Sequence, residues 1–210
     1  MASKRDDSGG DSDVREFVGP GSNVLVLAPV MDADTSAVCS DLLHVEQPSE
    51  EAVLLVTFTQ GADVRVEAFR EHADGKPADL HVVDVSGETR SSSDEPSHVP
   101  GRVVDVVSSP TDLTGIGIAI NEQLGEWAPG DLQVVLCFHT LTTLLQYASE
   151  DRVFQFLHVL TSRVSSIDAV AHYHLDPVAV DDRTVHTLMQ LFDVVVRQNP
   201  DGEWEVKSRV

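Results

Sequence analysis

A chain of 210 residues with 41% apolar residues is long enough to form one domain with a buried core. Its 35 Asp and Glu against 14 Lys and Arg give a net charge of −21, which argues against a general DNA- or RNA-binding protein and against docking on an anionic membrane surface. The first 16 residues are polar, and no apolar run reaches the ~18 residues that a membrane span needs, so we expect a cytoplasmic protein without a signal peptide.

The acidic residues are spread along the whole chain, and the only lysines are Lys4, Lys76 and Lys207. This composition is typical of a halophile that accumulates salt, because concentrated salt screens the repulsion between surface carboxylates. An ordinary acidic cytosolic protein is the alternative.

Short apolar runs alternate with segments of helical periodicity after a polar tail at residues 1–16, which we expect to be disordered. The runs predict strands at 24–27, 52–58, 80–85, 102–107, 132–138 and 169–175, and a terminal hairpin at 194–197 and 204–207. Helices are predicted at 37–43, 61–72, 110–127, 150–165 and 181–192, a loop at 87–101, and a loop or short helical turn at 140–147. Strands that alternate with helices specify one α/β domain over residues 17–210, with a mostly parallel sheet.

The first strand and helix frame a degenerate phosphate-binding loop. Aligned with the pattern G-x-x-x-x-G-K-[ST], the segment from Ala28 onward places Ala28 and Ala33 at the glycine positions and Asp34 at the lysine position, while Thr35 is retained. A carboxylate at position 34 would repel a triphosphate. We therefore expect a nucleotide-binding fold that has lost its nucleotide chemistry.

Asp32 and Asp34 have an alternative role at the start of the following helix. A side-chain carboxylate there accepts hydrogen bonds from the unpaired backbone N–H groups and contributes roughly 0.5–2 kcal/mol. The anion site would then be filled by the protein itself. A salt-dependent or metal-bridged site is the minor alternative.

The order of segments from Gly21 to the C-terminus resembles the RecA-superfamily ATPases of the KaiC-like group, and more narrowly an uncharacterised haloarchaeal branch whose phosphate loop is degraded. The segments that carry the resemblance are GSNVLVLAP, SPTDLTGIGIAI, LCFHTLTTLLQYASEDRVFQFLHVLTSRV and LDPVAVDDRTVHTLMQLFDVVV. The resemblance implies a three-layer RecA-like sandwich of the P-loop NTPase type, with a C-terminal antiparallel hairpin.

The resemblance also implies where catalytic residues would stand. His139 occupies the position of the metal-holding acid, and Thr59 and Gln60 occupy the position of the water-activating glutamate. With Asp34 at the lysine position, three separated positions are substituted. The interpretation is a non-catalytic domain, or pseudo-ATPase, with a regulatory or protein-interaction role and no cofactor, and RecA/KaiC-like paralogues are candidate partners. The alternative is a RecA-superfamily ATPase that binds ATP with magnesium and hydrolyses it slowly or not at all. Either a monomer or a homo-oligomer fits.

Three histidines are a minor candidate for a metal site. His172 and His174 alternate along one predicted strand and share a face, and His139 ends a neighbouring strand, so the three could hold zinc. Histidines at strand ends are more often simply hydrogen-bonded, and we expect no resident metal. Cys39 and Cys137 both lie in apolar segments and are predicted to be free and buried.

At the C-terminus, Lys207 and Arg209 resemble a basic pair that relatives extend toward a neighbouring subunit's nucleotide. The simpler interpretation is a solvated terminal strand.

Overall fold

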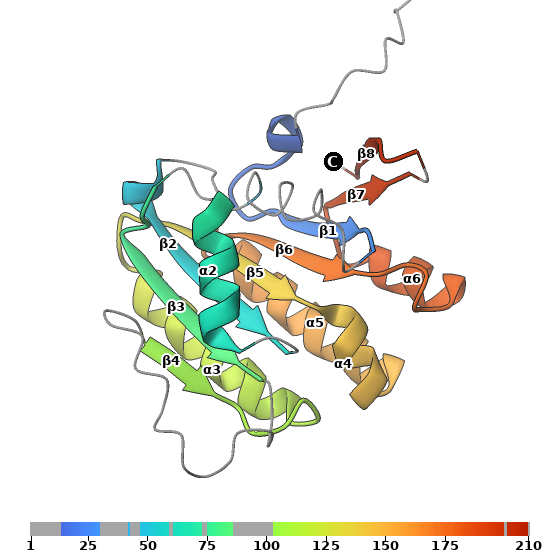
Figure 1. The fold of residues 1–210 in the computed structure, drawn as a ribbon, viewed down its shortest axis with the longest axis horizontal. Coiled ribbons are helices and arrows are strands. Elements are labelled where there is room, and N and C mark those ends of the chain that lie inside the picture. The colour runs from blue at the N-terminus through green and yellow to red at the C-terminus, as the bar shows by residue number, and fades with distance from the viewer. Residues whose placement is uncertain are drawn as a thin grey trace, which may run out of the picture.

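The computed structural model describes residues 14–29, 42, 47–58, 61–72, 75–85, 103–199 and 201–209. Within these ranges eight strands form one sheet in the order β4-β3-β2-β5-β6-β1-β7-β8, in which all neighbouring strands are parallel except the pair β7 and β8 (Figure 1). The strands are β1 Asn23–Leu27, β2 Glu51–Thr57, β3 Asp79–Asp84, β4 Val103–Val106, β5 Gln133–His139, β6 Val170–Leu175, β7 Val194–Gln198 and β8 Trp204–Ser208. The predicted α/β class, with a mostly parallel sheet and a C-terminal antiparallel pair, is confirmed.

Helices cover both faces of the sheet and make three layers. Figure 1 shows α2 on the near face and α3 and α5 on the far face. The described helices are α2 Ala62–His72, α3 Leu113–Trp127, α4 Leu141–Tyr147, α5 Glu150–Ser166 and α6 Asp182–Met189, together with the short 3-10 helices η1 Val14–Phe17 and η2 Pro48–Glu50. None of these helices is long and apolar enough to cross a membrane.

The central strands are buried on both faces, which is why their sequences are almost continuously apolar. Every residue of β1, β2 and β6 is buried. The larger apolar core lies between the sheet and helices α3, α5 and α6, and a smaller core lies between the sheet and α2. Each face of the sheet therefore packs into its own apolar core.

Side-chain caps fix where the far-face helices begin. Oδ1 of Asp112 accepts a 2.8 Å hydrogen bond from the backbone N–H of Gly115 at the start of α3. Oδ1 of Asp181 accepts from the backbone N–H of Thr184 in α6 at 3.1 Å. Each cap satisfies a backbone donor that has no partner inside its helix.

Two local differences from the predicted elements have simple causes. Residues 141–147 form a regular helix, α4, because the hydroxyl of Thr140 caps it by accepting from the backbone N–H of Thr142. Residues 14–16, assigned to the tail, belong to η1, where Val14 is buried against Val24 and Val26 of β1. Val18, directly after the turn, packs against the same cluster.

Candidate functional site

The degenerate phosphate loop begins at the carboxyl end of β1, the end of a parallel sheet at which ligands bind. Ala28 follows β1, is buried, and donates its backbone N–H to the carbonyl of Leu175 at 3.2 Å. The other predicted loop positions, Ala33, Asp34 and Thr35, lie outside the described residues, as does Asp32. The predicted carboxylate cap therefore stays a prediction.

His139 is the last residue of β5, so it also lies at the carboxyl end of the sheet. Its strand position is in register with Thr57 at the end of β2, and its side chain is buried. Thr59 and Gln60, the other positions implied by the resemblance, lie outside the described residues. The described residues thus include the position that the resemblance assigns to the metal-holding acid, His139, but not the position of the water-activating glutamate.

Four side chains lie together on one face of β5 and β6. We call these residues the histidine–cysteine cluster: Cys137, His139, His172 and His174. Cys137 is the direct cross-strand neighbour of His172. His174 lies two residues beyond His172 on the same face, and the ring centroids of these two histidines are 5.2 Å apart. The ring of His139 lies 5.0 Å from that of His174. All four side chains are buried.

The sulfur and ring nitrogens of this cluster converge. Sγ of Cys137 and one ring nitrogen each of His172 and His174 all lie within 4.8 Å of one another. His139, the fourth member of the cluster, lies against His174 but is not one of these three. The structure thus brings the predicted pair His172 and His174 together with Cys137, which the sequence analysis treated only as a buried thiol.

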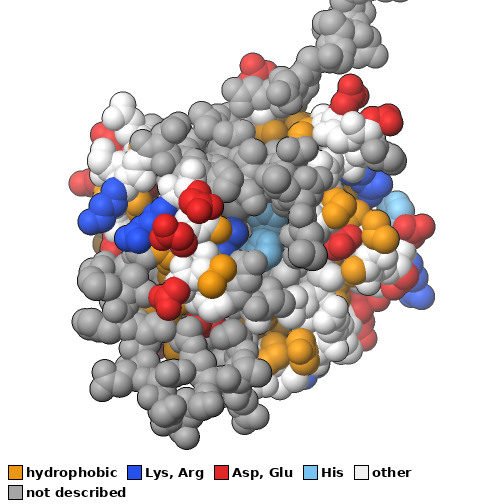
Figure 2. All heavy atoms as spheres, viewed as in Figure 1, with side chains coloured by type: hydrophobic (Ala, Val, Ile, Leu, Met, Phe, Trp, Pro, Cys, Tyr) orange, Lys and Arg blue, Asp and Glu red, His pale blue; other side chains and the backbone are white. Residues whose placement is uncertain are grey.

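One cation from helix α2, Arg65, reaches the cluster. Nη2 of Arg65 donates a 3.0 Å hydrogen bond to Sγ of Cys137, and the arginine is itself buried. The start of α2 is fixed by the end of β3, because the backbone N–H of Ala62 donates to Oδ2 of Asp84 at 3.1 Å. Figure 2 shows histidine side chains in the middle of this face, next to Lys or Arg side-chain atoms.

The predicted basic residues near the C-terminus make contacts within the chain. Nζ of Lys207 lies 3.0 Å from Oε1 of Glu205 on the same strand. Arg209 donates from Nη1 to the carbonyl of Gln190, just after α6, at 2.5 Å. A cation at a helix C-terminus meets the unpaired carbonyls there. Lys207 and Arg209 thus both interact with groups of their own chain.

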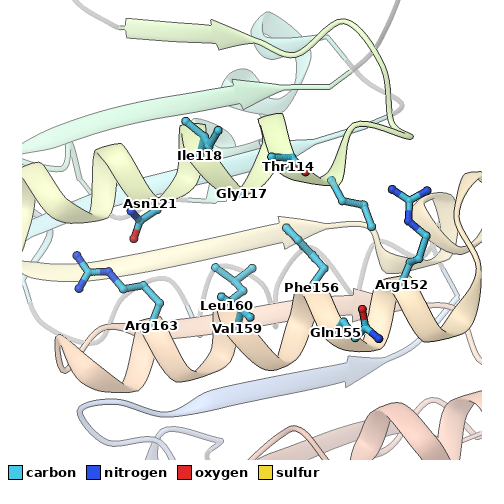
Figure 3. Close-up of a pocket in the computed structure, with 11 residues that line it drawn as sticks. Thr114, Gly117, Ile118, Asn121, Arg152, Gln155, Phe156, Val159, Leu160 and Arg163 are labelled. Carbon is cyan, nitrogen blue, oxygen red and sulfur yellow. The ribbon is translucent and has the colours of Figure 1, made fainter.

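A groove on the far side of the sheet runs between α3 and α5 and has a volume of about 490 Å³ (Figure 3). Arg152 lies at one end and Arg163 at the other, with apolar side chains between them. Two of these are strongly exposed, Ile118 at 53% and Val159 at 70%. The remaining lining residues are Leu113, Thr114, Gly117, Asn121, Gln155, Phe156 and Leu160.

Gly117 of α3 lines this groove opposite Phe156 of α5. A Cβ added at position 117 would make an ordinary van der Waals contact with Cε2 of Phe156, at 3.5 Å. Phe156 packs against the larger core and is half-buried, with one side toward the groove. The helical pattern of α5 alone could not show this, because it does not report how closely a second helix approaches.

The chain belongs to the family of unknown function DUF7504, whose model matches residues 21–198. No curated protein sequence matches it. Among solved structures, it is similar to the PH0250 protein of Pyrococcus horikoshii OT3, with a TM-score of 0.64 and 11% identity over 95% of this chain and 92% of that one. It is also similar to the uncharacterised PH0321 protein of Pyrococcus horikoshii in complex with an unknown peptide, with a TM-score of 0.59 and 12% identity over 91% of this chain and 85% of that one. At these identities the likeness shows the fold alone.

Proposed function

We propose that this chain is a non-catalytic RecA-like domain that acts by binding a protein segment in the groove between α3 and α5. The observation that carries the proposal is the groove itself, in which exposed aliphatic side chains lie between two arginines. Apolar clefts with a few charged groups at their rims are typical of sites for peptide helices.

The groove specifies the chemistry of its partner. Arg152 and Arg163 are eleven positions apart on α5, which is about 16 Å along the helix axis. An amphipathic helix with carboxylates three turns apart would pair with both arginines and place apolar residues on Ile118 and Val159. We therefore propose an acidic amphipathic helix of another protein as the occupant.

Two arginines at this groove stand out on a chain with a net charge of −21. The overall negative charge would repel an acidic segment at long range, but the repulsion is screened beyond ~10 Å at 0.1 M salt. Contact with the two guanidinium groups is then the dominant electrostatic interaction. The peptide present on the similar PH0321 protein gives a precedent for peptide binding by this fold.

The non-catalytic part of the proposal is supported by His139. In the RecA-like resemblance, the residue at the end of β5 is a carboxylate that holds magnesium, and an imidazole is a poor ligand for this oxygen-preferring ion. The alternative function, ATP binding with weak or no hydrolysis, requires magnesium and phosphate to be held without that acid and without the loop lysine.

A synthetic peptide tests the groove directly. The probe is a fluorescein-labelled amphipathic helix with aliphatic residues at positions i, i+3, i+4 and i+7 and glutamates eleven positions apart, and its control is the same peptide with lysines in place of the glutamates. We expect micromolar binding of the acidic peptide by anisotropy. Val159→Glu should weaken it at least tenfold, whereas Val178→Glu, at a site 87% exposed outside the groove, should not change it.

Equal binding of both peptides, no binding of the acidic peptide, or equal binding by the Val159→Glu variant contradicts the proposed groove. The nucleotide hypothesis is tested separately by titrating labelled ATP with magnesium in molar KCl. We expect no binding at micromolar ATP. Micromolar affinity would overturn the non-catalytic assignment and leave the peptide result untouched.

A further inference from the structure

We propose that Cys137, His172 and His174 form a binding site for a zinc-class transition metal ion, beyond the protein-binding role proposed above. The three side chains come from adjacent central strands, β5 and β6, and lie on the face that α2 covers. No part of the peptide-binding proposal depends on this site, because the groove lies on the opposite face of the sheet.

The arrangement suits a tetrahedral ion. Zinc bonds to sulfur at ~2.3 Å and to imidazole nitrogen at ~2.0–2.1 Å, which places the ligand atoms of one ion roughly 3.3–3.8 Å apart. The sulfur and the two nitrogens here already lie within 4.8 Å of one another.

The parallel register makes this convergence a fixed property of the sheet. Cys137 and His172 are paired positions on neighbouring strands, which lie ≈4.8 Å apart. His174 follows on the same face of the same strand. Their flanking strand positions on that face are aliphatic: Leu55 pairs with Cys137, and Val24 and Val26 pair with His172 and His174. Three metal-ligating side chains thus stand together, with aliphatic residues at these paired positions of the flanking strands.

The kind of ligand selects the kind of metal. Thiolate and imidazole bind zinc, cobalt and copper, whereas magnesium and calcium require oxygen ligands. Nη2 of Arg65 donates a 3.0 Å hydrogen bond to Sγ of Cys137, so a donor already lies against the sulfur that would bind the ion. Donors of this type around a bound thiolate also orient it toward the ion.

His139 lies beside the three ligands and is the candidate for a fourth ligand to the ion. Its ring lies 5.0 Å from the ring of His174, at the end of β5 that opens toward the carboxyl edge of the sheet. With His139 bound, the ion has four protein ligands, as structural zinc sites do. With three ligands, the fourth position is open.

The test uses full-length protein stripped with a chelator and titrated with Co²⁺ and Zn²⁺ in concentrated KCl. We expect one equivalent of Co²⁺ to bind, with a thiolate-to-cobalt charge-transfer band and the visible bands of a tetrahedral ion, and Zn²⁺ to displace it. Cys137→Ser should abolish the charge-transfer band, and His172→Gln should weaken binding at least tenfold. Cys39→Ser should keep the band, and His158→Gln, an exposed histidine on α5, should bind like the unaltered protein.

The unaltered protein is informative without any variant, so a variant that fails to fold does not block the test. If the unaltered protein binds no stoichiometric Co²⁺ or Zn²⁺, or if the bound Co²⁺ lacks a thiolate band, the proposal is wrong. It is also wrong if a folded Cys137→Ser variant keeps the band, or if Cys39→Ser loses it. Circular dichroism of each metal-free variant establishes that the fold is present.

Discussion

The hydroxyl of Tyr173 on β6 donates a 3.1 Å hydrogen bond to Oδ1 of Asn23 on the neighbouring strand β1, and both residues are buried. The amide nitrogen of Asn23 in turn donates to the carbonyl of Thr161 and to Oγ of Ser165 in α5, at 3.2 and 3.1 Å. Burial, and secondarily the charge of Asp193, raises the pKa of the tyrosine far above its ordinary value. The phenol therefore stays protonated at neutral pH and can donate this bond.

Removal of this hydroxyl should destabilise the protein. Tyr173→Phe leaves Oδ1 of Asn23 without its donor in a buried site, at an expected cost of about 1–3 kcal/mol in the free energy of unfolding. Tyr147→Phe is the matched control, because Tyr147 is 54% exposed. Urea unfolding at fixed salt measures both, and equal midpoints for the two variants would contradict the role assigned to this bond.

Two glycines in α3 should respond differently to the same substitution. Alanine in a helix gains ~0.5–1 kcal/mol over glycine at both positions. A Cβ at Gly125 meets only Nη2 of Arg163, at 3.7 Å, whereas a Cβ at Gly115 collides with the carboxylate of Asp112 that caps the helix. We expect Gly115→Ala to be less stable than Gly125→Ala by about 0.5–2 kcal/mol, the value of a lost cap. Thermal melts of the two variants side by side measure the difference.

The cap of α6 should give a defined pH dependence. The side-chain hydroxyl and then the backbone N–H of Thr184 lower the pKa of Asp181 in the folded protein. A lowered pKa stabilises the fold above the unfolded-state value of ~3.9, and this contribution is lost as the pH falls through the folded-state pKa.

Asp181→Ala should therefore be less stable than the unaltered protein at pH 7, and the difference should shrink below about pH 4. Asp201→Ala, in the exposed turn between β7 and β8, is the control. Unfolding free energies from pH 2 to 7 give the comparison. A deficit in the Asp181→Ala variant that stays constant on acidification would mean that the carboxylate does not act through its charge.

Salt should stabilise the protein steeply at low concentration. With a net charge of −21, folding brings many carboxylates together, and their repulsion is screened as the Debye length falls from ~30 Å at 0.01 M to ~10 Å at 0.1 M. Screening predicts that most of the rise in melting temperature occurs below about 0.3 M KCl. A rise that continues in proportion up to molar KCl would instead indicate weak ion binding or exclusion of salt from the surface.

The elements of this fold could be predicted from the sequence because buried parallel strands and amphipathic helices leave strong local patterns. Val24 to Leu27 is apolar without a break, and the inward side chains of α5 recur at helical spacing. The strand order is not local information. The sequence of β6 does not indicate that this strand lies between β5 and β1. Its place in the sheet depends on how the connecting helices pack, which is not a local property.

The histidine–cysteine cluster could likewise be predicted only in part, because part of it depends on non-local strand pairing. His172 and His174 could be paired from their spacing because they share a strand. Cys137 could not be added to them, because the relation depends on the register between β5 and β6. The available signal was weak: Cys137 precedes His139 by two residues, so both lie on one face of β5. Arg65, from a helix across the layer, left no signal of this kind.

The outermost strand β8 has a consequence for how copies of this chain can meet. Its five residues carry Glu205 and Lys207 on one side, and exposed charges on a short border strand oppose the addition of a foreign strand. At the far border, β4 is shorter still, with four residues including Asp105. Lateral growth of the sheet from molecule to molecule is thus disfavoured at both of these margins.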